Sequence, residues 1–245
     1  KIMKKTFLML ALISFSAISF AGGHGSNSSH TSNGSNGSYF KITFSDTELS
    51  ADTFSFHNPT GTGTTDNTTS GNYIIMTSID DDEDITAMSL AYGMHVMGMR
   101  TELSYTMREP VTFTGNASFS STDFLQTLEV DADELMVTMY HDMPISFATF
   151  SLGVGAGYTF SESNGYQGAS GYFPRSKDQE FSYALSAGLS IPVMSNISID
   201  IRYSYKDLGK VKTGNTQGIA GMNDDERLEA DLEEDTMSVS LSILF

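Results

Sequence analysis

The chain has 245 residues, a formal net charge of -17, and neither cysteine nor tryptophan. So acidic a surface repels phosphate, which excludes nucleic acids as partners, and the lack of cysteine excludes disulfides as a source of stability. Only 39% of the residues are hydrophobic, a low value for a soluble core but an ordinary one for a membrane barrel with a polar interior.

The N-terminal segment has the features of a secretory signal peptide. Lys4 and Lys5 precede a short apolar run, and a small-residue cleavage site ends at Ala21. The run is interrupted by serines and is too short for a spanning helix. We therefore expect a signal peptide at residues 1–21, a disordered leader rich in Gly, Ser and Asn at 22–38, and an outer-membrane β-barrel domain at 39–245.

Eight later segments alternate apolar and polar residues with the period of two that is typical of β-strands. The last segment shows it plainly, because Met237, Val239 and Leu241 alternate with serines. Its length of about ten residues is that of a tilted strand crossing a bilayer. The predicted strands are 39–45, 85–96, 99–107, 129–141, 148–160, 179–191, 197–206 and 236–245.

The connections between these strands alternate between short and long. Short turns are predicted at 97–98, 142–145 and 192–196, and long polar loops at 46–84, 108–128, 161–178 and 207–234. This is the topology of an outer-membrane barrel, with short turns in the periplasm and long loops outside the cell. The predicted fold is all-β: an eight-stranded antiparallel, up-and-down transmembrane β-barrel with a polar interior and long extracellular loops.

The composition of the two strand faces predicts which one contacts lipid. On strands 148–160 and 179–191 one face carries Ser, Gly and Ala with almost no Lys or Glu. Small residues suit the narrow interior of an eight-stranded barrel, whereas a water-exposed face would carry charges. The other face places Tyr and Phe near the strand ends, where aromatic rings favour the headgroup level. We expect the apolar face to contact lipid.

A few charged residues fall on the predicted inner face. They are Lys41, Arg100, Glu102, Glu134, Asp200, Arg202 and Lys206. Because an unpaired charge in a narrow lumen is costly, we expect Arg100 and Arg202 to neutralise Glu102, Asp200 or Glu134. The favoured interpretation is a structural plug that fixes strand register, and a gated polar path is the alternative.

Three stretches together resemble the opacity-type surface antigens and related OmpA-like small barrels of Gram-negative bacteria. They are ELMVTMYHDMPI with the following FATFSLGVGAGYTF, MGMRTELSYT, and FSYALSAGLSIPVMSNISIDIRYSYKDLGKV. The family's motif positions are held here by Arg100, Glu102, Tyr140, Asp142, Pro144, Gly153, Gly155, Gly157, Arg202, Tyr203, Leu208, Gly209 and Phe245. The resemblance implies an outer-membrane location and insertion by the barrel-assembly machinery, with Phe245 as the insertion signal. It implies a surface antigen, adhesin or envelope-stabilising barrel without catalytic residues or cofactors.

The loops carry the main functional hypothesis, because binding residues usually lie on loops of a rigid scaffold. Carboxylates are dense in two of them, which makes Asp80, Asp81, Asp82, Asp84, Asp224 and Asp225 weak candidates for a shared Ca²⁺ or Mg²⁺. Neither run has the spacing of a calcium loop, so solvated acidic loops are favoured. We expect a monomer in contact with outer-membrane lipid and lipopolysaccharide, and a host or surface ligand is a further candidate partner.

Two alternatives belong to other functional classes. A small ion channel requires the inner charges to move, since eight strands leave a narrow lumen. A lipid A-modifying enzyme requires a nucleophile, a base and an orienting acid within reach of one another. His95 and His141 form no recognisable triad with their sequence neighbours, so no catalytic residue is predicted.

Overall fold

The structure is a computed structural model that describes residues 37–57, 69–70, 73–96, 99–119, 122–168, 171–216 and 226–245. The predicted signal peptide and nearly all of the predicted leader lie outside this part of the chain. No helix among these residues has the length and apolar character needed to cross a membrane.

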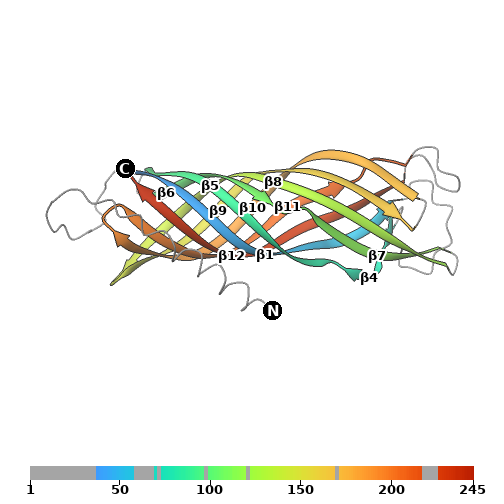
Figure 1. The fold of residues 1–245 in the computed structure, drawn as a ribbon, viewed down its shortest axis with the longest axis horizontal. Helices are drawn as coiled ribbons and strands as arrows, with labels where there is room; N and C mark the ends of the chain where they lie inside the picture. The colour runs from blue at the N-terminus through green and yellow to red at the C-terminus, as the bar shows by residue number, and fades with distance from the viewer. Residues whose placement is uncertain are drawn as a thin grey trace.

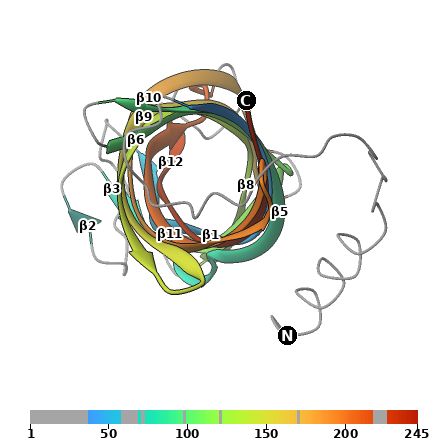
Figure 2. The same cartoon turned by 90° about the vertical axis from the view of Figure 1, so that its left-hand side faces the viewer.

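Eight antiparallel strands close into a barrel, which confirms the predicted fold (Figures 1 and 2). Each strand pairs with its sequence neighbours in the wall, and the last pairs back with the first from Tyr39 and Leu244 to His57 and Arg227. The strands are β1 (Ser38–His57), β5 (Asp82–Val96), β6 (Met99–Arg108), β8 (Thr122–Ile145), β9 (Ala148–Gln167), β10 (Gly171–Met194), β11 (Ile197–Lys212) and β12 (Arg227–Leu244).

Four further strands extend the wall at the end remote from the short turns. They are β2 (Thr69–Ser70), β3 (Tyr73–Ile75), β4 (Thr77–Asp80) and β7 (Val111–Phe119). β7 follows β6 after Pro110 and pairs with β8 and β4, while β3 pairs with the end of β1. At the opposite end the backbone N–H of Phe245 donates to the carbonyl of Ser38, beside the short turns.

The strands run far into the stretches predicted as long loops, so those four loop boundaries are wrong. β1 continues to His57, β8 begins at Thr122, β11 continues to Lys212, and β12 begins at Arg227. Alternation persists through these segments with the opposite polarity, because the apolar side chains face inward and the charged ones outward. A polar composition here therefore reflects an outer wall in contact with water.

The membrane half of the barrel comprises the strand portions close to those predicted from sequence. Its outward side chains are apolar and exposed, as at Val154, Leu185 and Leu241, whereas Ser240 is only 4% exposed and faces the lumen. The predicted polarity is confirmed in this half. β8 and β10 have 24 residues each, about twice the 9–11 that a tilted strand needs to cross the hydrocarbon.

The other half, which we call the extracellular half after the side on which the topology predicts the long loops, comprises the strand portions that lie in those predicted loops. On β12, Leu228, Ala230 and Leu232 are fully buried, while Asp231 and Glu233 lie on the outer side. An apolar inside and a charged outside are the pattern of a barrel folded in water. The predicted polar lumen is therefore wrong for this half.

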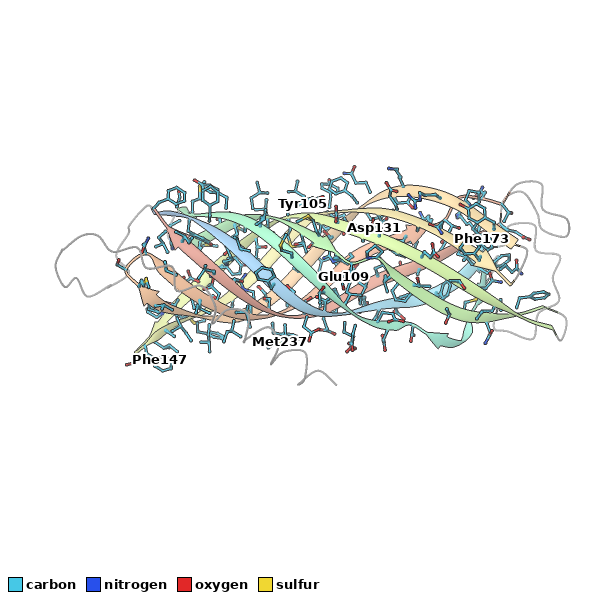
Figure 3. The ribbon with its side chains drawn as sticks, viewed as in Figure 1. Tyr105, Glu109, Asp131, Phe147, Phe173 and Met237 are labelled. Carbon is cyan, nitrogen blue, oxygen red and sulfur yellow. The ribbon has the colours of Figure 1, made fainter. Side chains whose placement is uncertain are left out.

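An aromatic belt separates the two halves on the outer surface. Its members are Tyr105, Tyr158, Phe160, Phe181, Tyr183, Tyr203 and Tyr205. The hydroxyl of Tyr105 donates to Asp133 at 2.5 Å, and that of Tyr203 donates to Asp235. In Figure 3, Tyr105 lies between Phe147 at the short-turn end and Phe173 toward the other end. Rings on the lipid side with hydroxyls on the water side are typical of a membrane interface.

Candidate functional site

The lumen contains three successive layers of buried side chains, which together form the candidate site. A lower charge cluster lies nearest the short turns, an upper charge cluster lies near the level of the aromatic belt, and an apolar plug fills the extracellular half. The strands contribute alternate residues to these layers, because successive side chains of a strand point to opposite faces. Bulges shift this alternation on β1, between Asp52 and Ser55, and on β11, between Asp207 and Gly209.

Glu102 is the centre of the lower charge cluster. The cluster consists of Tyr39, Lys41, Arg100, Glu102, Tyr140, Asp142, Asp200 and Arg202. The Glu102 carboxylate pairs with Arg100 at 2.6 Å, with Arg202 at 3.6 Å, and with Lys41. It also accepts hydrogen bonds from Tyr39 at 2.5 Å and Tyr140 at 3.2 Å. The Glu102 carboxylate on β6 thereby connects this strand with β1, β8 and β11.

Two other carboxylates balance the remaining charge of this cluster. Asp142 accepts two hydrogen bonds from the Arg100 guanidinium, at 2.8 and 3.0 Å, in the bidentate geometry that strengthens such pairs. Asp200 lies 3.4 Å from Lys41 Nζ and accepts a hydrogen bond from Ser242 at 2.7 Å. Three cations therefore face three carboxylates, so the lumen contains no large unbalanced charge at this level.

Two glycines make room for the tyrosines of the lower cluster. A Cβ atom at Gly93 would overlap the ring of Tyr39, and one at Gly153 would lie 2.5 Å from the ring of Tyr140. The Arg100 and Arg202 guanidinium carbons each lie 4.3 Å from the centre of the Tyr140 ring, within the range of a cation–π contact. The glycines thus let an aromatic ring lie flat against the neighbouring strand.

Arg108, Glu134, Lys206 and Glu234 form the upper charge cluster, in which cations and carboxylates alternate. Arg108 lies 2.5 Å from Glu234 and 3.2 Å from Glu134, and Lys206 lies 3.0 Å from each carboxylate. Thr236 donates a further hydrogen bond of 2.5 Å to Glu234. The charges cancel, and the arrangement ties β6, β8, β11 and β12 together across the lumen.

The apolar plug occupies the interior of the extracellular half. It consists of Leu49, Ala51, Phe54, Phe56, Met76, Ile85, Val111, Phe113, Ala117, Leu128, Val130, Ala132, Phe173, Leu208, Val211, Leu228, Ala230 and Leu232. These residues come from walls all around the barrel, and Phe56 packs edge-on against Phe173 at 6.0 Å between ring centres. Such a core excludes water and ions, because hydration of a charge cannot be replaced by methyl groups.

All seven charged residues assigned to the lumen from sequence lie in the two charge clusters, with Lys41, Arg100, Glu102, Asp200 and Arg202 in the lower and Glu134 and Lys206 in the upper. Sequence reasoning missed Arg108, Asp142 and Glu234 because they fall in predicted loops or turns. Their spacing was the available signal, because residues an even number apart on one strand lie on the same face. Arg108 is eight residues from Arg100, and Glu234 is four residues from Ser238.

The acidic candidates for a cation site are not brought together by the part of the chain that is described. No group of His, Asp and Glu side chains suited to a metal occurs there, and Asp82 accepts a hydrogen bond from Ser50 at 2.6 Å. Asp224, Asp225 and the Asp80 side chain lie outside the described set. His141 is exposed on the outer face, and His95 Nδ1 lies 3.5 Å from the Gly37 carbonyl oxygen.

Comparison with known proteins gives a match to a sequence family. The model of a family described as "Outer membrane protein beta-barrel domain" matches residues 7–245. No curated protein shows significant sequence similarity to the chain.

Solved structures of outer-membrane barrels are similar in fold. OprG from Pseudomonas aeruginosa has a TM-score of 0.50 at 11% identity, covering 85% of this chain and 96% of that one. Neisserial surface protein A gives 0.46 at 13% identity, covering 85% and 97%. The protease OmpT from Escherichia coli gives 0.43 at 11% identity, covering 86% and 97%. At 11% identity the similarity to OprG shows a shared fold and nothing about activity. The TM-scores of the other two structures are below 0.5, so no conclusion is drawn from them.

Proposed function

The chain belongs to the outer membrane β-barrel family, and from that premise we propose that it is a cell-surface protein with a structural and surface-interaction role. In this proposal the membrane half is an anchor. The extracellular half is a watertight stalk that raises the connecting segments, including the acidic ones, above the lipid, where they act as an antigen or adhesin does.

The observation that carries this proposal is the continuation of the strands beyond the aromatic belt. A barrel that only crossed the membrane would need no apolar plug, because its strands would end near the headgroups. Here Phe54, Phe113 and Phe173 are completely buried above that level. Burying a side chain of this size contributes about 1.5–3 kcal/mol, so the extracellular half is held as a rigid support for binding segments.

Surface binding is tested by replacing the segments 58–68 and 217–225 with short Gly/Asn turns in cells that display the protein. We expect the variant to keep the heat-modifiable gel mobility of a folded barrel and to lose adhesion to host cells and matrix-coated surfaces. The matched control carries the same two segments in scrambled order. Adhesion that is equal in the wild type and the shortened variant would contradict the proposal.

The filled lumen argues against the alternative of an ion channel. An ion would have to pass two neutral charge clusters and the apolar plug, and the side chains of Arg108, Glu134 and Glu234 are each 1% exposed. We expect purified protein in planar bilayers to show no discrete conductance steps. Steps that Arg108→Ala enlarges would support a channel instead.

A non-enzymatic role is part of the proposal and has its own test. The charged side chains of the two charge clusters are engaged with other groups of the lumen, as Glu102 is with Tyr39 and Arg100. We expect lipid A to have the same mass spectrum with and without overproduction of the protein. A shifted lipid A mass on overproduction would contradict this part.

A further inference from the structure

The positively charged residues of the chain are distributed very unevenly. After Ser38 the sequence contains ten Lys and Arg residues, and five of them, Lys41, Arg100, Arg108, Arg202 and Lys206, lie inside the lumen. The other five lie on three adjacent strands of the extracellular half. We call this set the basic strip: Arg175 and Lys177 on β10, Lys210 and Lys212 on β11, and Arg227 on β12.

The strip is continuous across the three strands. The regular pairing of β10 with β11 ends at Tyr183 and Asp207. Beyond that point two hydrogen bonds join the strands: the Lys212 N–H donates to Asp178 at 3.2 Å, and the Gly214 N–H donates to the Pro174 carbonyl at 2.7 Å. β11 and β12 stay paired as far as Lys212 and Glu229. The five cations therefore share one flank of the wall.

The side chains of Arg175, Lys177 and Lys210 are at least 40% exposed, whereas Lys212 is partly buried and Arg227, 28% exposed, pairs at 2.6 Å with the buried Glu229. The side chains of Lys177 and Arg175 are 75% and 63% exposed, and both pair with Glu162. The hydrogen bond from Lys177 and the nearby Arg175 hold the pKa of Glu162 below its usual value. Lys210 lies 3.5 Å from Asp231, and Lys212 makes no ion pair with any described residue. Exposed pairs of this kind are weak and exchange readily for another anion.

The opposite flank carries outward carboxylates without cations. The outer faces of β1, β5 and β8 in the extracellular half carry Asp46, Glu48, Asp84, Glu129 and Asp131 without a single Lys or Arg. Net charge alone would make this protein a poor ligand for any anion. The basic strip is interspersed with Asp207, Asp231, Glu233 and the buried Glu229, so its charges nearly balance. Among the described residues it is still the flank on which an anion meets exposed cations, whereas the opposite flank repels it.

The height of the strip identifies the kind of anion. Lys177 lies four residues beyond the belt residue Phe181, and Lys212 lies seven beyond Tyr205. With a rise of about 3.3 Å per residue and a tilt of about 45°, these side chains stand roughly 9 to 16 Å above the belt. The strip faces sideways at that height, toward the sugars of neighbouring lipids and not toward open solution above the barrel.

We propose that the basic strip binds the phosphate and carboxylate groups on the inner sugars of lipopolysaccharide in the surrounding outer leaflet. The proposal rests on the outer-membrane location within the proposed function, but it assigns a site on the side wall that surface adhesion does not use. Binding orients the barrel, because only one flank can hold lipopolysaccharide by direct contact with cations.

The test uses the folded full-length protein in zwitterionic detergent and the triple variant Lys177→Gln, Lys210→Gln, Lys212→Gln. The probes are a deep-rough lipopolysaccharide with phosphorylated inner sugars, the same preparation after phosphatase treatment, and inorganic phosphate. The matched control is Asp46→Asn, Glu48→Gln, Asp84→Asn on the opposite flank. Gel mobility before and after boiling verifies that each barrel is folded.

We expect the triple variant to bind the phosphorylated lipopolysaccharide about tenfold more weakly than the wild type, since three exposed charge contacts are lost. The control should bind at least as tightly as the wild type, and the difference between wild type and triple variant should shrink with the dephosphorylated probe. Equal Kd values for wild type and triple variant, or inorganic phosphate that binds as tightly as the lipid, would overturn the proposal. Either result would leave the adhesion assay of the proposed function unaffected.

Discussion

The two halves of the barrel are built from the same strands but have opposite polarity. In the membrane half of β12, Leu241 faces outward and Ser240 inward, whereas in the extracellular half Leu232 faces inward and Asp231 outward. The strand keeps its alternation of faces while the surroundings change from lipid to water. The solvent at each level, and not the fold, therefore determines which face is apolar.

The largest expected effect comes from removing the centre of the lower charge cluster. Glu102→Ala leaves Lys41, Arg100 and Arg202 in a narrow lumen without their shared carboxylate. We expect a loss of about 3–5 kcal/mol in the free energy of unfolding, measured by urea titration in phospholipid vesicles with circular dichroism. The matched control is Glu162→Ala on the outer surface of the extracellular half, where water screens the cations and the loss should be much smaller. Similar losses in both variants would contradict the distinction between inside and outside.

A leucine truncation on each side of the boundary should have an intermediate effect. Leu232→Ala leaves a cavity in the apolar plug, so we expect a loss of about 2–5 kcal/mol. Leu241→Ala on the same strand should cost less, because lipid chains fill the vacated space. The same urea titration compares the two variants, and a larger loss for Leu241→Ala would mean that the plug is not packed.

Much of the membrane half could be predicted from sequence. A strand with one apolar face and one face of small residues has one stable arrangement in a bilayer, with the apolar face toward lipid and the small face toward the lumen. The inner positions of Arg100, Glu102 and Arg202 followed from this arrangement. The extracellular half could not be recognised in the same way. Its strands, such as 46–57 of β1, carry charges outward, and a bulge between Asp52 and Ser55 moves the inward apolar residues from Leu49 and Ala51 to Phe54 and Phe56, so no regular period of two is visible there. The signal of a continuing strand is that Leu228, Ala230 and Leu232 fall on the same face as Ser238 with no break in the period of two.

The smallest expected effect concerns a carboxyl group on the outer wall of the extracellular half. Partial burial, with Asp133 and Glu162 nearby, raises the pKa of Asp131. The folded state therefore holds this proton more tightly than the unfolded chain does. The protonated Asp131 therefore stabilises the folded state at low pH. This contribution is lost as the pH rises from the usual carboxyl pKa of about 4 through the raised pKa of Asp131.

Replacing Asp131 by Asn should remove this loss. As the pH rises through this window, we expect the urea concentration at the unfolding midpoint to increase slightly for the variant relative to the wild type. The effect is small because water screens an exposed group. A difference between the two midpoints that stays constant with pH would show that Asp131 is not perturbed.

Single cysteines along β12 test the central claim, the reversal of polarity at the aromatic belt, most directly. The chain contains no cysteine of its own, so each variant reports one position to a membrane-impermeant maleimide applied to intact cells. We predict fast labelling at Asp231→Cys and Glu233→Cys, and protection at Leu232→Cys, Met237→Cys and Leu241→Cys. Labelling at 232 as fast as at 231, or protection of 231 and 233 together with 241, would contradict a water-exposed wall around an apolar plug.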